Sequence, residues 1–85
     1  MKDIKFKVEG MGIHGNVLWM GCSTAITGYL AGLQEIKEIH FDNETRQFSL
    51  TSETYNKTKL EKALKIVSIK EQRIFTLSDY SEKTL

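Results

Sequence analysis

The sequence of 85 residues contains no proline, one cysteine and almost no excess of charge. A single cysteine cannot form a disulfide within the chain, so no disulfide framework is expected. Twelve basic and eleven acidic residues give a net charge of +1, which provides no field to attract nucleic acid or an anionic membrane. There is also no flexible linker and no apolar signal segment. We therefore expect a single domain over residues 1–85, located in the cytoplasm.

Charged side chains are missing from residues 10–34, between Glu9 and Glu35. A membrane-spanning helix needs about 20 predominantly apolar residues. This run instead contains all six glycines together with polar residues such as His14 and Asn16. No membrane span is therefore expected, and the run needs another explanation.

Apolar and polar residues alternate in several parts of the chain, which is typical of half-buried strands. In the first of them, Ile4, Phe6 and Val8 lie on one side of the predicted strand. The last segment of the chain is polar, and we expect it to be a flexible tail. The predicted strands and tail are residues 2–9, 38–42, 47–51 and 73–77, followed by a tail over 79–85.

Apolar residues at helical spacing predict two helices. The first begins either near Cys22 or at Asn16 as its N-cap, and the second covers residues 54–67 with Thr54 or Asn56 as its N-cap. The apolar stripe of the first helix consists of Cys22, Ala25, Ile26, Tyr29, Leu30 and Leu33.

The resulting order βαββαβ predicts an α+β, ferredoxin-like sandwich, in which two helices pack on one face of a four-stranded antiparallel sheet. The open face of this sheet would be polar. It would lack the outward aromatic pair with which RNA-binding domains of similar topology stack bases, so no nucleic-acid partner is expected. The residues expected on that face are Lys5, Lys7, Glu38, His40, Gln47 and Ser49.

Two local motifs in this arrangement are Val8-Glu9-Gly10-Met11, which ends the first strand, and Met20-Gly21-Cys22, which leads into a helix. With them the chain resembles the heavy-metal-associated domain of copper chaperones, mercuric transport proteins and metal-transporting ATPases. In that family a Cys-x-x-Cys pair binds a soft cation such as Cu(I), Zn(II), Cd(II) or Hg(II). The resemblance implies a small metallochaperone-like domain, with a metal-transporting ATPase or another metal protein as its partner.

The metal motif departs from the family pattern. Only one of the two cysteines is present, as Cys22, and residues 12–20 form an insertion before it. The unpaired N–H groups of a helix N-terminus would favour its thiolate. The resemblance then implies that the other ligands come from Met20, His14 or Met11, or from a cysteine of a second chain. The alternative is that Cys22 is simply packed in the apolar stripe of the helix.

The side of the first helix expected to face water carries small, uncharged residues. Thr24, Gly28 and Gly32 are spaced four apart and form a ridge that would let another backbone approach closely. Glycine inside a helix costs about 1 kcal/mol relative to alanine, so contact with a covering element would offset that cost. Either the preceding segment with Trp19 covers the ridge, or the helices of two protomers pair. The second function hypothesis is therefore a relative without a metal site that acts as an interaction or homodimerisation module through residues 10–34.

Catalysis is not expected from this sequence. Acylphosphatases share the topology and require an arginine in the loop after the first strand, but residues 10–34 contain no arginine. The two histidines form no recognisable catalytic triad with serine and an acid. We therefore predict a binding protein rather than an enzyme.

Overall fold

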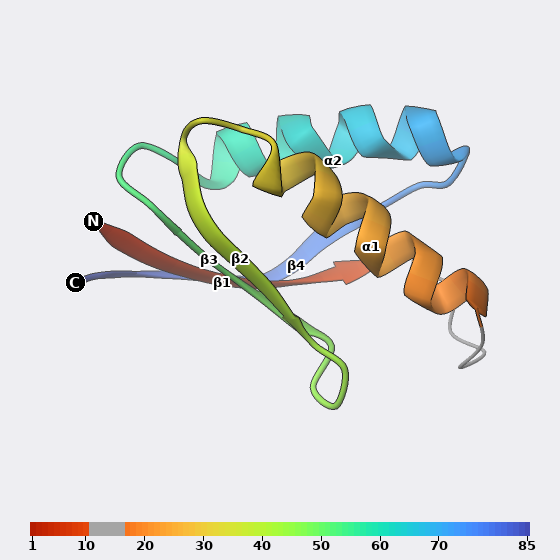
Figure 1. Cartoon of the computed structure of the whole chain (residues 1–85), viewed down its shortest axis with the longest axis horizontal. Coiled ribbons are helices and arrows are strands. Elements are labelled where there is room, and N and C mark those ends of the chain that lie inside the picture. Colours follow the sequence, from red (N-terminus) through yellow and green to blue (C-terminus); the bar gives the residue numbers. More distant parts are fainter. Residues whose placement is uncertain (11–16) are drawn as a thin grey trace.

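The computed structural model describes residues 1–10 and 17–85, and it describes side chains except those of residues 11–21. Six helices and strands follow one another in the predicted order βαββαβ (Figure 1). They are β1 (Lys2–Glu9), α1 (Val17–Ala31), β2 (Ile36–Asp42), β3 (Gln47–Ser52), α2 (Lys57–Glu71) and β4 (Thr76–Thr84).

The four strands form one antiparallel sheet in the order β2-β3-β1-β4. Both helices lie on the same face of this sheet, so the domain has two layers (Figure 1). The predicted α+β, ferredoxin-like fold is confirmed. Among the described residues, no helix is long and apolar enough to cross a membrane.

The core lies between the sheet and the helices. At its centre Phe6 of β1 pairs with Phe48 of β3, and their rings stack with centroids 4.9 Å apart. Phe41 of β2 adds a tilted contact to Phe48 at 4.6 Å. From α1, Cys22, Ile26 and Leu30 of the predicted stripe are buried against this layer, as are four residues of α2. Burying a large apolar side chain contributes about 1.5–3 kcal/mol, so these contacts dominate the stability. The residues from α2 are Leu60, Ala63, Leu64 and Val67.

The opposite face of the sheet is polar, as the sequence predicts. His40 pairs with Ser49 across β2 and β3, and both side chains lie on the face away from Phe48. Lys5 and Glu38 on the same face are exposed. The face away from the helices therefore carries polar and charged side chains.

Buried Ser52 links the loop between α1 and β2 to the loop between β3 and α2. Ser52 is completely buried, and its hydroxyl donates to the carbonyl oxygen of Glu35 at 2.6 Å while accepting the N–H of Tyr55 at 3.1 Å. The Asn56 side chain then accepts the N–H of Lys59 at 2.9 Å, which confirms it as the N-cap of α2. Lys59 reaches back to Glu35 with its ammonium group 2.6 Å from the carboxylate, and this contact holds the pKa of Glu35 below its usual value. The start of α2 is thereby tied to the start of β2.

The C-terminal segment differs from the prediction. Residues 79–85 were expected to be a flexible tail, but β4 continues to Thr84 and pairs with β1 from Glu9↔Thr76 to Lys2↔Thr84. The N–H of Leu85 also donates to the carbonyl of Met1, and the two ends of the chain lie side by side in Figure 1. The expected strand over 73–77 therefore begins later and extends further.

The first helix also begins earlier than one of the two predicted starts. It begins at Val17, so the start near Cys22 is wrong, and the last four residues of the predicted insertion are helical. The alternative start at Asn16 agrees with this boundary, although Asn16 itself lies outside the described residues.

Tyr80 provides a pH-dependent contribution to stability. Burial and a hydrogen bond from its hydroxyl to the Glu82 carboxylate (2.9 Å) raise the pKa of Tyr80 to about 12. Because this pKa lies above the ordinary value of 10, the contribution is complete below about pH 10 and is lost as the pH rises towards 12. We predict that Tyr80→Phe makes the fall of the unfolding free energy above pH 10 shallower. Urea denaturation at pH 9, 10 and 11 measures this pH dependence, and the exposed substitution Ser81→Ala is the control. An unfolding free energy that falls equally steeply with pH in the wild type and in Tyr80→Phe would contradict the prediction.

Gly10 closes β1 in a conformation that other residues rarely adopt. Its φ is +98°, and a Cβ atom at this position would lie 1.9 Å from the carbonyl oxygen of Ile74. We predict that Gly10→Ala lowers the unfolding free energy by about 2 kcal/mol or more, because alanine is strained at this φ and its Cβ would clash with the Ile74 carbonyl. Urea denaturation measures this. Gly28→Ala is the matched control, since a Cβ at Gly28 has no atom within 4 Å, and equal effects of the two substitutions would refute the explanation.

Candidate functional site

The residues proposed from the sequence are only partly described. Met11 and His14 lie outside the described residues, and so do the side chains of Met20 and Trp19, whose backbones belong to α1. Of the predicted metal ligands, Cys22 is therefore the one whose surroundings can be analysed. The ridge residues Thr24, Gly28 and Gly32 are all described.

Cys22 is buried in the apolar core. It is the sixth residue of α1 and 4% exposed, and it belongs to the same core cluster as Ile26 and Leu30. The free N–H groups of a helix belong to its first four residues, so Cys22 lies beyond the turn that would stabilise a thiolate. Among the described side chains, no group of three or more His, Cys, Asp or Glu residues is arranged to hold a metal ion. The thiol in this position fits the packed alternative better than a coordination sphere.

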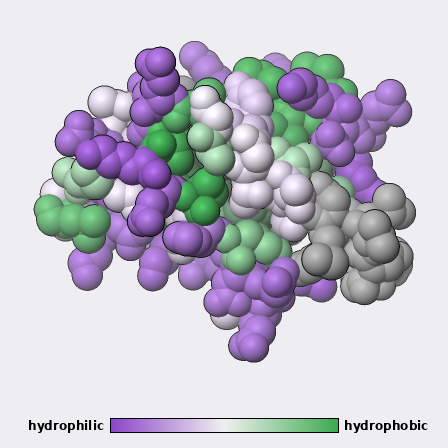
Figure 2. All heavy atoms as spheres, viewed as in Figure 1, coloured by the Kyte–Doolittle hydropathy of each residue, from purple (hydrophilic) through white to green (hydrophobic). Residues whose placement is uncertain are grey.

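The ridge lies on the solvent side of α1, opposite the side that contacts the core. Thr24, Gly28 and Gly32 are exposed, as is Ala31, and open space surrounds the position of a Cβ at Gly28. Thr27 folds its hydroxyl back onto the helix by donating to the Ser23 carbonyl at 2.9 Å. Figure 2 shows a pale band of near-neutral residues along α1, bordered on one side by green hydrophobic residues. The exposed side of α1 therefore presents backbone and small side chains without charge.

The second helix has a different surface. Its exposed residues are mostly charged, and its Lys70 ammonium lies 6.0 Å from the centre of the Tyr29 ring of α1. On the other side of α1, Ala31 lines a shallow hollow of about 200 Å³ together with Ile36 and Ile39 of β2. The end of α1 at Ala31 thus borders β2, whereas Tyr29 borders α2. The exposed charged residues of α2 are Lys57, Glu61, Lys62, Lys65, Lys70 and Glu71.

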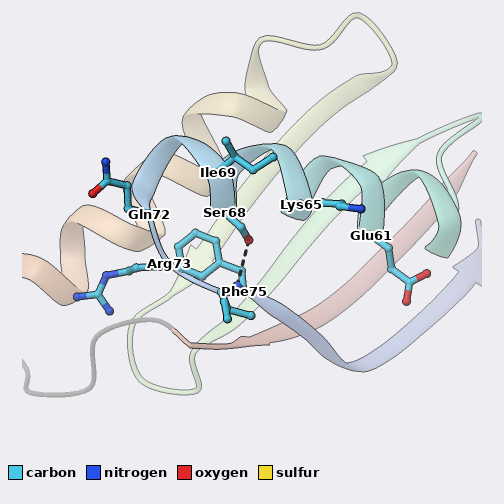
Figure 3. Close-up of a pocket in the computed structure, with 8 residues that line it drawn as sticks. Glu61, Lys65, Ser68, Ile69, Gln72, Arg73 and Phe75 are labelled. Carbon is cyan, nitrogen blue, oxygen red and sulfur yellow. Dashed lines mark hydrogen bonds between the residues drawn. The ribbon is translucent and has the colours of Figure 1, made fainter.

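Sequence reasoning missed a groove between α2 and the segment that enters β4. This hollow has a volume of about 490 Å³ (Figure 3). Two of its lining residues, Ile69 and Ile74, are 73% and 83% exposed. The signal in the sequence was Ile69, which lies outside the buried stripe of α2 and has no role in the core. The lining residues are Glu61, Lys65, Ser68, Ile69, Gln72, Arg73, Ile74 and Phe75.

The burial of Cys22 can be tested by its reactivity. We predict that the thiol of the folded protein reacts with 5,5′-dithiobis(2-nitrobenzoic acid) at least about 100-fold more slowly than that of the protein in 6 M guanidinium chloride, because the folded core excludes the reagent. The release of nitrothiobenzoate measures both rates. A folded-state rate close to that of the unfolded chain would show that Cys22 is accessible, as a metal ligand in an open loop would be.

No family model matches the chain, and no curated protein or solved structure matches it significantly.

Proposed function

We propose that this chain is a non-catalytic protein-interaction domain that forms a homodimer through the exposed side of α1. The observation that carries the proposal is the absence of charge on this side, from Thr24 to Gly32, in a chain of which 27% of the residues are charged. Surface helices of monomeric proteins usually carry charged residues on the side that faces water. α2 of the same domain follows that rule and α1 does not.

The ridge also has the shape that close helix packing requires. Small residues at intervals of four let two helix backbones approach, and the space beside Gly28 is open. A helix interior containing Gly28 costs about 1 kcal/mol relative to alanine, and dispersion contacts with a second helix offset this cost. In a twofold dimer the same ridge meets itself, so one uncharged surface serves both protomers. The neighbouring hollow, lined by Ile36 and Ile39 but also by Lys37, Glu38 and His40, would lie at the rim of the interface.

The soft-metal function stays a prediction from the resemblance. It would use Cys22 with Met20, His14 or Met11 and Cu(I) or a similar cation, delivered to a metal-transporting ATPase. The burial of Cys22 favours the interaction domain over this alternative.

The substitution Gly28→Lys distinguishes an effect on dimerisation from an effect on folding. In a monomer this substitution should leave the stability unchanged or raise it by up to about 1 kcal/mol, because lysine is a better helix former than glycine and nothing obstructs its Cβ. In the dimer it would place two like charges in the contact. We therefore predict at least a tenfold weaker dimer with an undiminished unfolding free energy of the monomer, measured by sedimentation equilibrium and urea denaturation.

The matched control is Thr58→Lys, which adds the same charge at an exposed position of α2. It should leave the dimer constant unchanged. A wild-type protein that sediments as a monomer at about 100 μM, or a Gly28→Lys dimer as strong as that of the wild type, would refute the proposal.

A further inference from the structure

The groove between α2 and β4 lies next to a free edge of the sheet. Within the described part of the chain, β4 has one strand neighbour, β1, so the main-chain groups along its other side have no partner in the ladder. Glu61, Lys65, Ser68 and Gln72 recur at helical spacing and form the wall of the groove on α2. Phe75, directly before β4, lies beneath the helix in Figure 3. A strand added to β4 would therefore lie with alternate side chains directed at this groove.

Hydrogen bonds at Ser68 fix the segment after α2 against the helix. The Ser68 hydroxyl donates to the Leu64 carbonyl at 2.7 Å and accepts the N–H of Phe75 at 3.0 Å (Figure 3). The N–H of Arg73 donates to the Ser68 carbonyl at 3.1 Å, after α2 ends at Glu71 and Gln72 caps it in a left-handed conformation. A ligand would thus enter a preformed hollow and would not have to order the segment from Gln72 to Phe75, which lowers the entropic cost of binding.

Only a short part of the β4 edge is suited to pairing. The ladder between β1 and β4 is irregular opposite Asp79, whose φ is +49°, and charged Glu82 and Lys83 follow. A bulge and charged residues on an edge oppose the addition of another strand. Thr76, Leu77 and Ser78 precede the bulge and are uncharged. A long ladder with a second copy of β4 is therefore disfavoured, whereas a short extended segment fits these three residues.

The charge around the groove selects the ligand. Three charged residues line the groove, two basic and one acidic, which gives its lining an excess of one positive charge. Lys65 and Arg73 are among the lining residues. The exposed Ile69 and Ile74 offer apolar surface between them. Acidic residues on either side of one large apolar side chain complement this arrangement.

We infer that the groove binds an extended acidic peptide segment of another protein, which adds a short strand to β4 at Thr76–Ser78 and inserts one large apolar side chain beside Ile69 and Ile74. This is strand addition, in which main-chain hydrogen bonds supply affinity and a side-chain pocket supplies specificity. The groove volume of about 490 Å³ lies within the usual range of ligand sites. The site is separate from the ridge of α1, so both surfaces can be occupied at once.

A set of synthetic heptapeptides tests the proposal. Each has Asp-Glu at its N-terminus, Val-X-Val in the middle and Asp-Glu at its C-terminus, where X is Ala, Leu, Met or Phe. A matched set has lysine in place of every acidic residue. We expect fluorescence anisotropy to show affinity rising with the size of X, and at least tenfold weaker binding of the lysine set. In ¹H–¹⁵N spectra the acidic peptides should shift the amide signals of Phe75 to Ser78.

Variants of exposed isoleucines supply the controls. Ile74→Ser and Ile69→Ser should each weaken binding of the X = Leu peptide about tenfold or more, because apolar contact with the ligand is lost. Ile66→Ser is the matched control, since Ile66 is 44% exposed on α2 but does not line the groove, and it should leave the affinity unchanged. Gly28→Lys should also leave it unchanged, so failure of the dimer proposal would not affect this result.

Three results would overturn the inference. The first is affinity for every acidic peptide weaker than about 1 mM, and the second is equal effects of Ile74→Ser and Ile66→Ser. The third is a concentration-dependent dimer that Ile74→Ser abolishes and Gly28→Lys does not, because the groove would then bind a second copy of the chain instead.

Discussion

The stacking of Phe6 on Phe48 is the contact on which the rest of the domain depends. These residues sit opposite each other on the two central strands, and Phe41 extends the aromatic contact to β2. Since β1 and β3 hold both edge strands in place, the register of this pair sets the register of the whole sheet. A slip of one strand by one residue would carry its ring to the polar face and separate it from the other ring. Each helix then has one apolar surface to cover, and its own buried stripe determines its rotation about its axis.

The two helices cover that surface in the same way but face water differently. The exposed residues of α2 are mostly charged, and Ile69, one of its two exposed isoleucines, lines the groove. α1 has no charge on its exposed side and buries Cys22 on the other. The cysteine therefore has a sufficient explanation as a core residue. Gly10, part of the motif that resembles metal-binding domains, likewise has a reason in the backbone, because the Ile74 carbonyl occupies the space of its Cβ.

Much of this fold was predictable because buried residues recur at regular intervals along most of its strands and helices. Ile4, Phe6 and Val8 alternate along β1, and the stripe from Cys22 to Leu30 repeats as a helix requires, so element type and inner face were both correct. β4 was not predictable in the same way. Only Leu77 and Tyr80 among its residues pack partly against the core, and the bulge at Asp79 shifts their spacing from two to three. Its ladder with β1 is a long-range contact that leaves almost no local signal.

The two candidate sites differ in the same way, because one was predictable from the sequence and the other was not. The exposure of Thr24, Gly28 and Gly32 followed from their position opposite the apolar stripe, and the structure confirms it. The groove could not be derived, because it arises where the turn after α2 brings Ile74 and Phe75 back beside Ser68. The spacing of residues along α2 does not indicate that the chain folds back against this helix after the turn. Ile69, an exposed apolar residue outside the buried stripe of α2, was the available clue.

The irregular ladders of the sheet have a further consequence for behaviour at high concentration. Both edge strands are interrupted, β4 opposite Lys5 to Lys7 and β2 between Ile36 and Glu38. A straight, uninterrupted edge would act as a template on which copies of the chain could stack into fibrils. Here each edge is regular over only a few residues, which opposes the joining of successive sheets in register. The bulge that obscured β4 in the sequence thus also opposes open-ended polymerisation along that edge.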